Sequence, residues 1–200
     1  MTRKRKAFWT LACLLTLAVS GGAFWLQDME ERRLAHRLHG HQHCFKHTGS
    51  GLQLFAFDND GRFPSHPDGW GDALLLLVRS NYLDIPFICG PTDDGRVFRE
   101  ALEKGTDVPE ELCTRVYVQG LSDDNRNGVC IMYDRHSHPG GDHFYQIVRR
   151  RVRECLDDYG SMSQIEDKRW PEFSRRQIKL LMERGFTREQ AEYYFPDGKE

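Results

Sequence analysis

The stretch FDNDGRFPSHPDGWGDAL, residues 57–74, decides how the chain is organised. An Asp-Asn-Asp-Gly turn and two prolines follow an apolar run directly, and the stretch is too irregular to be core and too aromatic to be a linker. A glycine at position 61 supplies the left-handed conformation that ends a helix, and the prolines keep the following chain extended. The stretch therefore predicts a helix end and a chain reversal. The residues expected to act structurally there are Asp58, Gly61, Phe63 and Pro64.

The chain before this turn predicts a long helix in two parts. Leu38, Phe45 and Leu52 recur at a spacing typical of one helix face, so residues 27–57 are predicted to be helical. Residues 7–26 carry no charge and follow four basic residues. At about 1.5 Å per residue they span about 30 Å, which predicts a transmembrane anchor with the remaining chain outside. A cleaved signal peptide, cut after AVS at 18–20, is the alternative.

The chain after the turn predicts a small sheet followed by helices. VYV and VCIMY are rich in β-branched and aromatic residues and predict short strands. A helix is expected from Asp72 to about Ser80, and QIVRRRVRECLDDYG and SRRQIKLLMERG are interpreted as helices. Thr187 and Gln190 form a predicted capping box. The expected organisation is an anchor at 1–26, its amphipathic continuation at 27–57, a sheet domain at 58–145 and a helical extension at 146–200.

Composition and cysteines narrow the classes of function. The chain has 28 Lys and Arg against 30 Asp and Glu, and this balance argues against a nucleic-acid partner. An exported domain could hold disulfides, and Cys89, Cys113 and Cys130 are the candidates, with the pairing open. The alternative is that these cysteines are small buried side chains.

The order of these parts resembles type IV pilin-like proteins, in particular the major pseudopilins of type II secretion and the prepilin-type proteins common in planctomycetes. In these families a long first helix ends in a run similar to LQLFAFDNDGRFP, and FICGPTDDG and YDRHSHPGGDHF resemble two later segments. The resemblance covers about residues 1–145. It implies an α+β fold in which a long N-terminal transmembrane helix packs on a small antiparallel sheet. It also implies that Phe55, Phe57 and Phe63 lock the helix end onto the sheet.

The function implied by the resemblance is structural. We expect a single-pass protein of the bacterial inner membrane with an extracytoplasmic domain, which contacts the lipid bilayer and other pilin-like subunits or secretion components. Ala7 and Phe8 match a prepilin peptidase site. The fifth mature position is Ala12 where the family has glutamate, which is a departure from the pattern that sets the register of the family's fibres. The last 55 residues have no counterpart in the family.

Three groups of side chains could bind metal, and metal binding is the alternative function. Imidazoles at helical spacing could take Zn²⁺ or Cu²⁺, and an Asp/Asn-rich loop has the spacing of a Ca²⁺ site. No cofactor is certain, and Ca²⁺ is the possible one. A metal-dependent hydrolase using the DRHSHPGGDH segment is a weaker alternative, because the spacing of its histidines and aspartate differs from that of known hydrolases. We therefore expect that the protein is not an enzyme. The candidates are His36, His39, His43 and His47; Asp123, Asn125, Asn127 and Asp134; and, for the hydrolase, Asp134, His136, His138, Asp142 and His143.

Overall fold

The structure, a computed structural model, describes residues 3–90, 95–124, 126–141 and 147–199. Within these ranges the side chains of residues 3–15, 17–18, 31, 34–43, 140–141 and 147–149 are not described. The predictions at Asn125, Asp142 and His143 lie outside the described residues, and those at Ala7, Phe8, His36, His39 and His43 lie outside the described side chains.

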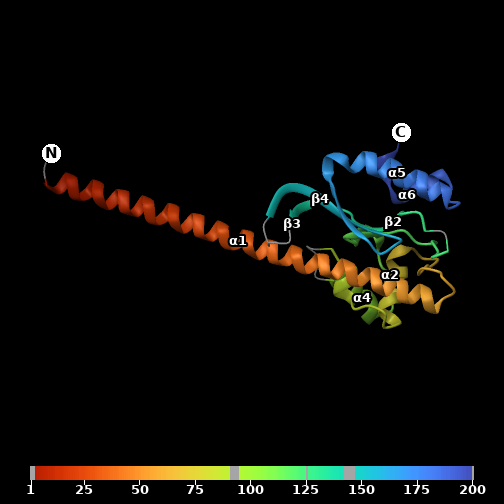
Figure 1. Ribbon diagram of the computed structural model, residues 1–200. Helices are drawn as coiled ribbons and strands as arrows, with labels where there is room; N and C mark the ends of the chain where they lie inside the picture. The colour runs from red at the N-terminus through yellow and green to blue at the C-terminus, as the bar shows by residue number, and fades with distance from the viewer. Residues whose placement is uncertain (1–2, 91–94, 125, 142–146, 200) are drawn as a thin grey trace.

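One helix dominates the shape of the molecule. Helix α1 runs over Arg3–Asp58 and projects far beyond the rest of the chain (Figure 1). We call residues 3–43 of α1 the arm and residues 44–199 the head. The predicted helix at 27–57 is confirmed, and Gly49 and Gly51 do not interrupt it. Gly51 allows α1 to pack closely on Leu83, because an added Cβ would lie 2.5 Å from Leu83 Cγ.

The prediction of a transmembrane anchor is wrong. Of the helices that the structure describes, none combines the length and the apolar character that crossing a bilayer requires. Asp28, Glu30 and Arg32 follow Leu26 within two turns of α1, so the described part of the helix is not a continuous apolar run. The fold class with a transmembrane first helix, the single-pass description and the inner-membrane location are corrected by the same finding.

The quoted turn ends α1 in the way that its residues predict. Gly61 has a φ of 76°, Phe63 is buried, and the carbonyl oxygen of Pro64 accepts a hydrogen bond from the Tyr117 hydroxyl at 2.9 Å. The Asp58 carboxylate accepts a hydrogen bond from the Tyr82 hydroxyl at 2.8 Å. The expectation for Phe57 is wrong, because its side chain is 83% exposed.

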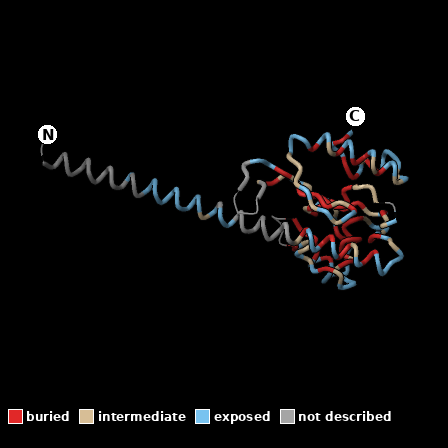
Figure 2. The backbone as a smooth tube through the Cα atoms, viewed as in Figure 1, coloured by how far each residue is buried: buried red, intermediate tan, exposed pale blue. Residues whose placement is uncertain are grey.

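Three short helices pack beside the C-terminal end of α1. They are α2 (Trp70–Arg79), α3 (Ile85–Ile88) and α4 (Arg96–Lys104), and the 3-10 turn η1 (Glu110–Leu112) follows them. The predicted helix from Asp72 to Ser80 is confirmed as α2. Its apolar face is buried inside the head, where the buried residues of the described chain gather (Figure 2).

The sheet is small and antiparallel. Its strands are β1 (Arg115–Tyr117), β2 (Cys130–Asp134), β3 (His138–Gly141), β4 (Ile147–Asp157) and β5 (Met162–Glu166). The two strands predicted from VYV and VCIMY are confirmed as β1 and β2. Strands β2 and β3 follow one another along the same edge of β4, β1 pairs with β2, and β5 pairs with the other edge of β4.

The interpretation of residues 147–157 as a helix is wrong, because they form β4. Val152, Glu154 and Leu156 are buried, and these positions alternate along a strand, whereas the helical interpretation placed Ile147, Val148, Val152 and Cys155 or Leu156 on one face. Pairing with β2, β3 and β5 outweighs the local helical pattern. The helices of this region begin later and lie across the sheet from α1: η2 (Asp167–Arg169), α5 (Trp170–Glu183), α6 (Arg188–Tyr194) and η3 (Pro196–Gly198) (Figure 1). The capping box of Thr187 and Gln190 is confirmed at the start of α6.

Candidate functional site

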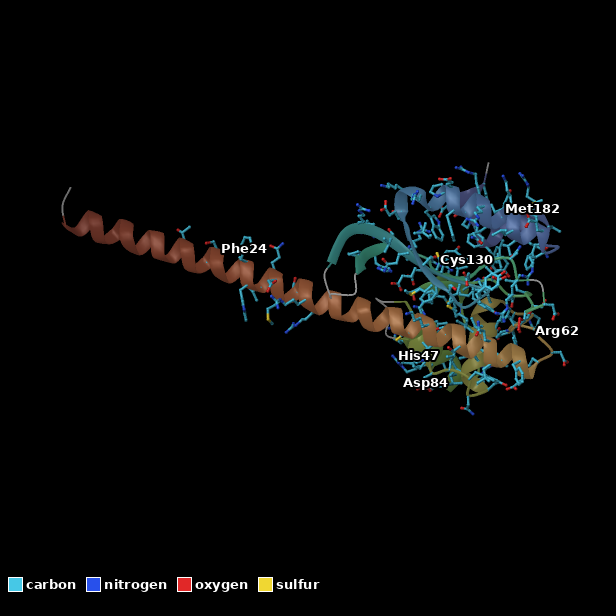
Figure 3. The ribbon with its side chains drawn as sticks, viewed as in Figure 1. Phe24, His47, Arg62, Asp84, Cys130 and Met182 are labelled. Atoms are coloured by element: carbon cyan, nitrogen blue, oxygen red, sulfur yellow. The ribbon has the colours of Figure 1, made fainter. Side chains whose placement is uncertain are left out.

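The arm is the first candidate site, because it presents apolar side chains to the surroundings. Phe24 is 79% exposed, and Val19, Trp25 and Leu26 are also exposed. Figure 3 shows Phe24 on the projecting helix, far from the head. Apolar side chains gathered in this way on one described stretch of helix mark a surface that can bind a partner.

The second candidate site is a buried polar cluster at the base of the arm, where α1 enters the head at Phe45. A bulge between strands β2 and β3 creates this cluster. Tyr133 of β2 pairs with Cys155, and His138 of β3 pairs with Val152. The two residues on the β2–β3 side are five positions apart and their partners on β4 are three apart, so two extra residues bulge out between them. Asp134 and His138 stand at the two ends of this bulge, and Glu154 lies opposite on β4.

The bulge brings three potential ligands together. The His138 Nε2 atom lies 3.0 Å from Asp134 Oδ2, and the Glu154 backbone N–H donates to the same oxygen at 3.1 Å. Glu154 Oε1 accepts a hydrogen bond from the Gln164 amide of β5 at 3.2 Å. One ligand atom from each of Asp134, His138 and Glu154 lies within 4.8 Å of the others, and all three residues are buried. The arrangement can therefore hold a proton or a metal ion.

An arginine and an aromatic ring close the cluster on the side of α1. Arg115 of β1 is 1% exposed, and its Nε atom lies 3.4 Å from Asp134 Oδ1. Its guanidinium carbon lies 3.8 Å from the ring centre of Phe45, and its Nη1 atom donates to the Phe87 carbonyl at 2.8 Å. Phe45 is fully buried on α1. The cluster is thus joined directly to the helix where the arm begins.

Burial shifts the protonation of the cluster. Burial first, and the Asp134 carboxylate second, raise the pKa of Glu154 to about 7. Burial alone would lower the pKa of His138, but its hydrogen bond and charge interaction with Asp134 outweigh it, so that pKa is raised. Burial also lowers the pKa of Arg115, against the attraction of Asp134 and Glu154. The charge states of these groups are therefore tied to one another.

Of the predicted histidine cluster, the structure describes the side chain of His47 alone. His47 is exposed on α1 and its ring centre lies 5.3 Å from that of Phe87. The side chains of its proposed companions on the arm are outside the described set, so this Zn²⁺ or Cu²⁺ site stays a prediction.

The residues of the predicted Ca²⁺ loop make separate contacts. Asp123 Oδ1 lies 2.8 Å from Arg126 Nη2, and the Asn127 amide donates to the Leu180 carbonyl at 3.2 Å. The buried Asp158 carboxylate accepts the backbone N–H groups of Asn127 and Gly128 at 3.0 and 2.9 Å. Asp134, the fourth predicted ligand, belongs to the buried cluster instead. Protein groups thus organise the described part of the loop, and Ca²⁺ binding stays a prediction.

Of the residues considered for a hydrolase, the structure brings Asp134 and His138 together, and His136 is exposed. No disulfide joins the cysteines whose side chains the structure describes, among them the three predicted candidates. Cys89 and Cys113 are buried, and the Cys130 sulfur lies 3.2 Å from the Met132 carbonyl oxygen, inside the head (Figure 3).

Sequence reasoning missed two members of the cluster, Arg115 and Glu154. Both signals were present, because each charged residue stands beside apolar residues of a strand. A charged residue at a buried strand position requires a partner, but the partner can be found only when the strand order is known.

Comparison of the chain with protein-family models, curated proteins and solved structures finds no match.

Proposed function

We propose that this protein is a pilin-like structural subunit that assembles with a second copy of itself through the arm. The observation that carries the proposal is the contrast along α1, where Phe45 is fully buried against the head and Phe24 is 79% exposed. Long helices in water gain most of their stability from packing an apolar face. A helix that projects from its domain with exposed aromatic side chains is therefore suited to packing against another helix.

The charge pattern of the arm favours a second copy as the partner. Residues 3–6 are all basic, and Asp28, Glu30 and Glu31 form an acidic group at the other end of an uncharged stretch. When two arms run antiparallel, the basic run of each lies beside the acidic group of the other. The uncharged residues 7–26 of one copy then lie beside residues 8–27 of the other. Both charge contacts form at once, as in a closed, twofold-symmetric pair.

A parallel pairing of two arms cannot form both charge contacts and also bring the uncharged stretches together. To place residues 3–6 beside residues 28–31, two parallel arms must be shifted by 25 positions. Residue 19 of the first copy would then lie beside residue 44 of the second, where the head begins. The head would block most of the contact, and the uncharged stretches would not meet. In the antiparallel pair, residue 44 of one copy and residue 44 of the other are separated by about 54 residues of helix rise. The two heads therefore begin about 80 Å apart.

The proposed role is therefore that of a spacer that holds two heads at the ends of a helical pair. The resemblance to pilin-like proteins in the run that ends α1, and the packing of α1 on an antiparallel sheet, support a structural role. The described cluster of Arg115, Asp134, His138 and Glu154 would keep the base of the arm in a fixed orientation relative to the sheet.

The test is the mass of the full chain in solution, measured by sedimentation equilibrium. We expect a dimer for the unchanged protein and a shift to monomer for the triple variant Phe24→Ala, Trp25→Ala, Leu26→Ala. The matched control replaces two exposed apolar residues of the head end of α1, Leu54→Ala and Phe57→Ala, which are 54% and 83% exposed. The control is expected to remain dimeric.

A second comparison tests the charge pairing. Reversing residues 3–6 to glutamate should weaken the dimer, and reversing residues 28, 30 and 31 to lysine in the same chain should restore it. A monomer for the unchanged protein, or a dimer that the arm variants leave intact, would contradict the proposed function.

A further inference from the structure

We propose that Asp134, His138 and Glu154 bind one divalent transition-metal ion, for which Zn²⁺ is the probe, and that this ion joins β2, β3 and β4 beneath the base of the arm. This site differs from the histidine-rich stretch of the arm and from the Asp/Asn-rich loop, and it does not depend on self-assembly. It follows from the bulge between β2 and β3, which turns three side chains from three strands toward one point.

The orientation of His138 points to a cation between it and Asp134. Its Nδ1 atom lies 3.0 Å from the backbone carbonyl oxygen of Pro139, which can only accept, so Nδ1 carries the hydrogen. In the neutral ring Nε2 is then a lone-pair atom, and it faces the carboxylate oxygen Asp134 Oδ2 at 3.0 Å. Two such atoms at this distance share a cation, which is either a proton on Nε2 or a metal ion that displaces this proton. A ring N–H held by a backbone carbonyl is also the usual way in which a metal-binding histidine is oriented.

The spacing of the atoms suits a metal ion. Two bonds of about 2.1 Å at the tetrahedral angle preferred by Zn²⁺ place their donor atoms about 3.4 Å apart, so the observed separation of 3.0 Å between His138 Nε2 and Asp134 Oδ2 needs to widen by only about 0.4 Å. Glu154 supplies the third ligand atom, and the three atoms lie within 4.8 Å of one another. A small movement of the Glu154 side chain would complete the set.

The groups that face the cluster from neighbouring elements are one charged, one polar and one aromatic side chain. Arg115 faces the cluster from β1 and lies beside Asp134 Oδ1 at 3.4 Å, so it offsets one of the two carboxylates. Gln164 approaches Glu154 from β5 with an uncharged amide, and the ring of Phe45 covers Arg115 from α1. A divalent cation at this point would meet both carboxylates and would displace the proton that His138 and Asp134 share.

The ligand set indicates both the class of ion and its role. One imidazole and two carboxylates suit Zn²⁺ and related divalent transition ions better than Ca²⁺, which prefers six or more oxygen ligands. All three ligands are buried, and Asp134 and Glu154 are at most 1% exposed. Three protein ligands leave the fourth position of a tetrahedral ion to water, as in catalytic sites, but the burial of all three ligands favours a structural role. The ion would fix the bulge and, through Arg115 and Phe45, the base of the arm.

The experiment is calorimetric titration of the purified, metal-free full chain with Zn²⁺, together with thermal unfolding with and without Zn²⁺. The background carries His39→Asn and His43→Asn, which remove binding by the arm. We expect one equivalent of Zn²⁺ and a rise in Tm. Glu154→Gln and His138→Asn should each weaken binding at least about 100-fold, more than the loss usual for a group that only orients a metal ligand.

The matched control is His136→Asn, because His136 is exposed and lies in the same bulge. It should bind Zn²⁺ as the background protein does. Circular dichroism must show that Glu154→Gln is folded. With Co²⁺ in place of Zn²⁺, the background protein should show a d–d absorption band that Glu154→Gln lacks. Binding that survives in folded Glu154→Gln, or no binding to the background protein, would overturn the proposal and leave His138 with a proton only. The sedimentation result is independent of both outcomes.

Discussion

The two ends of α1 belong to one helix but depend on different interactions. In the head, Phe45, Leu52 and Ala56 are fully buried, and contacts between residues distant in sequence determine the conformation. In the described part of the arm, the ion pair between Arg32 and Asp28, at 2.8 Å, joins residues one helical turn apart, and the aromatic side chains are exposed. One continuous helix can therefore supply a buried part of the core at one end and an exposed apolar surface at the other.

The largest expected effect compares two phenylalanines of α1. Phe45→Ala should lower the free energy of unfolding by about 3–5 kcal/mol, since it opens a cavity and uncovers the buried Arg115. Phe24→Ala should change it by less than about 0.5 kcal/mol, because this side chain is 79% exposed. Urea unfolding followed by circular dichroism measures both. Equal effects would show that the arm and the head are not distinct in this way.

Two glycines of α1 sharpen the comparison. Gly51→Ala should destabilise the protein by about 1–3 kcal/mol through overpacking, because the added Cβ would lie 2.5 Å from Leu83 Cγ. Gly21→Ala should instead stabilise the arm helix by up to about 1 kcal/mol, since nothing lies within 4 Å of an added Cβ. Thermal unfolding and helical content by circular dichroism distinguish the two. A stabilising Gly51→Ala would contradict the close packing of α1 on Leu83.

A smaller effect is expected inside the head at the capping box of α6. Thr187→Ala should cost about 1 kcal/mol, because the Thr187 hydroxyl accepts the Gln190 backbone N–H at 3.2 Å. The arm should be unaffected, so the mass in solution should stay that of the unchanged protein. A change in assembly would mean that α6, which the account places in the head alone, also takes part in the contact.

The smallest effects concern two exposed ion pairs of the same spacing. Glu100→Gln breaks the pair with Lys104 in the head, and Asp28→Asn breaks the pair with Arg32 in the arm. Neither should change the free energy of unfolding by more than about 0.5 kcal/mol. Only Asp28→Asn should weaken self-association, about two- to fivefold at low salt, because it removes a charge that faces the partner arm. The association constant from sedimentation measures the difference, and equal effects would argue against charge pairing.

The sequence was sufficient where local chemistry decides the structure. The exit from α1 at Asp58–Pro64, helix α2, strands β1 and β2 and the capping box were all predicted from turn residues, caps and side-chain type. These features depend on residues close together in the chain. The α+β class with a small antiparallel sheet was implied by the resemblance, together with a transmembrane first helix that the structure corrects.

Sequence reasoning failed where tertiary contacts decide. Residues 147–157 were assigned to a helix because their apolar positions also fit a helical period, and only pairing with β2, β3 and β5 makes them a strand. This error hid Glu154, whose partners come from β2 and β5. Asp134 and His138 were singled out, but with companions from their own segment. The membrane prediction was based on the uncharged run at 7–26 and is wrong, because no helix among the described residues is long and apolar enough to cross a bilayer.

The most direct test of the central claim is small-angle X-ray scattering of the full chain at the concentration where the dimer predominates. The account predicts the mass of two chains and a distance distribution with a second maximum beyond about 80 Å, from two heads held apart by an antiparallel pair of arms. The mass of one chain, or a dimer with a single maximum from heads packed side by side, would contradict it.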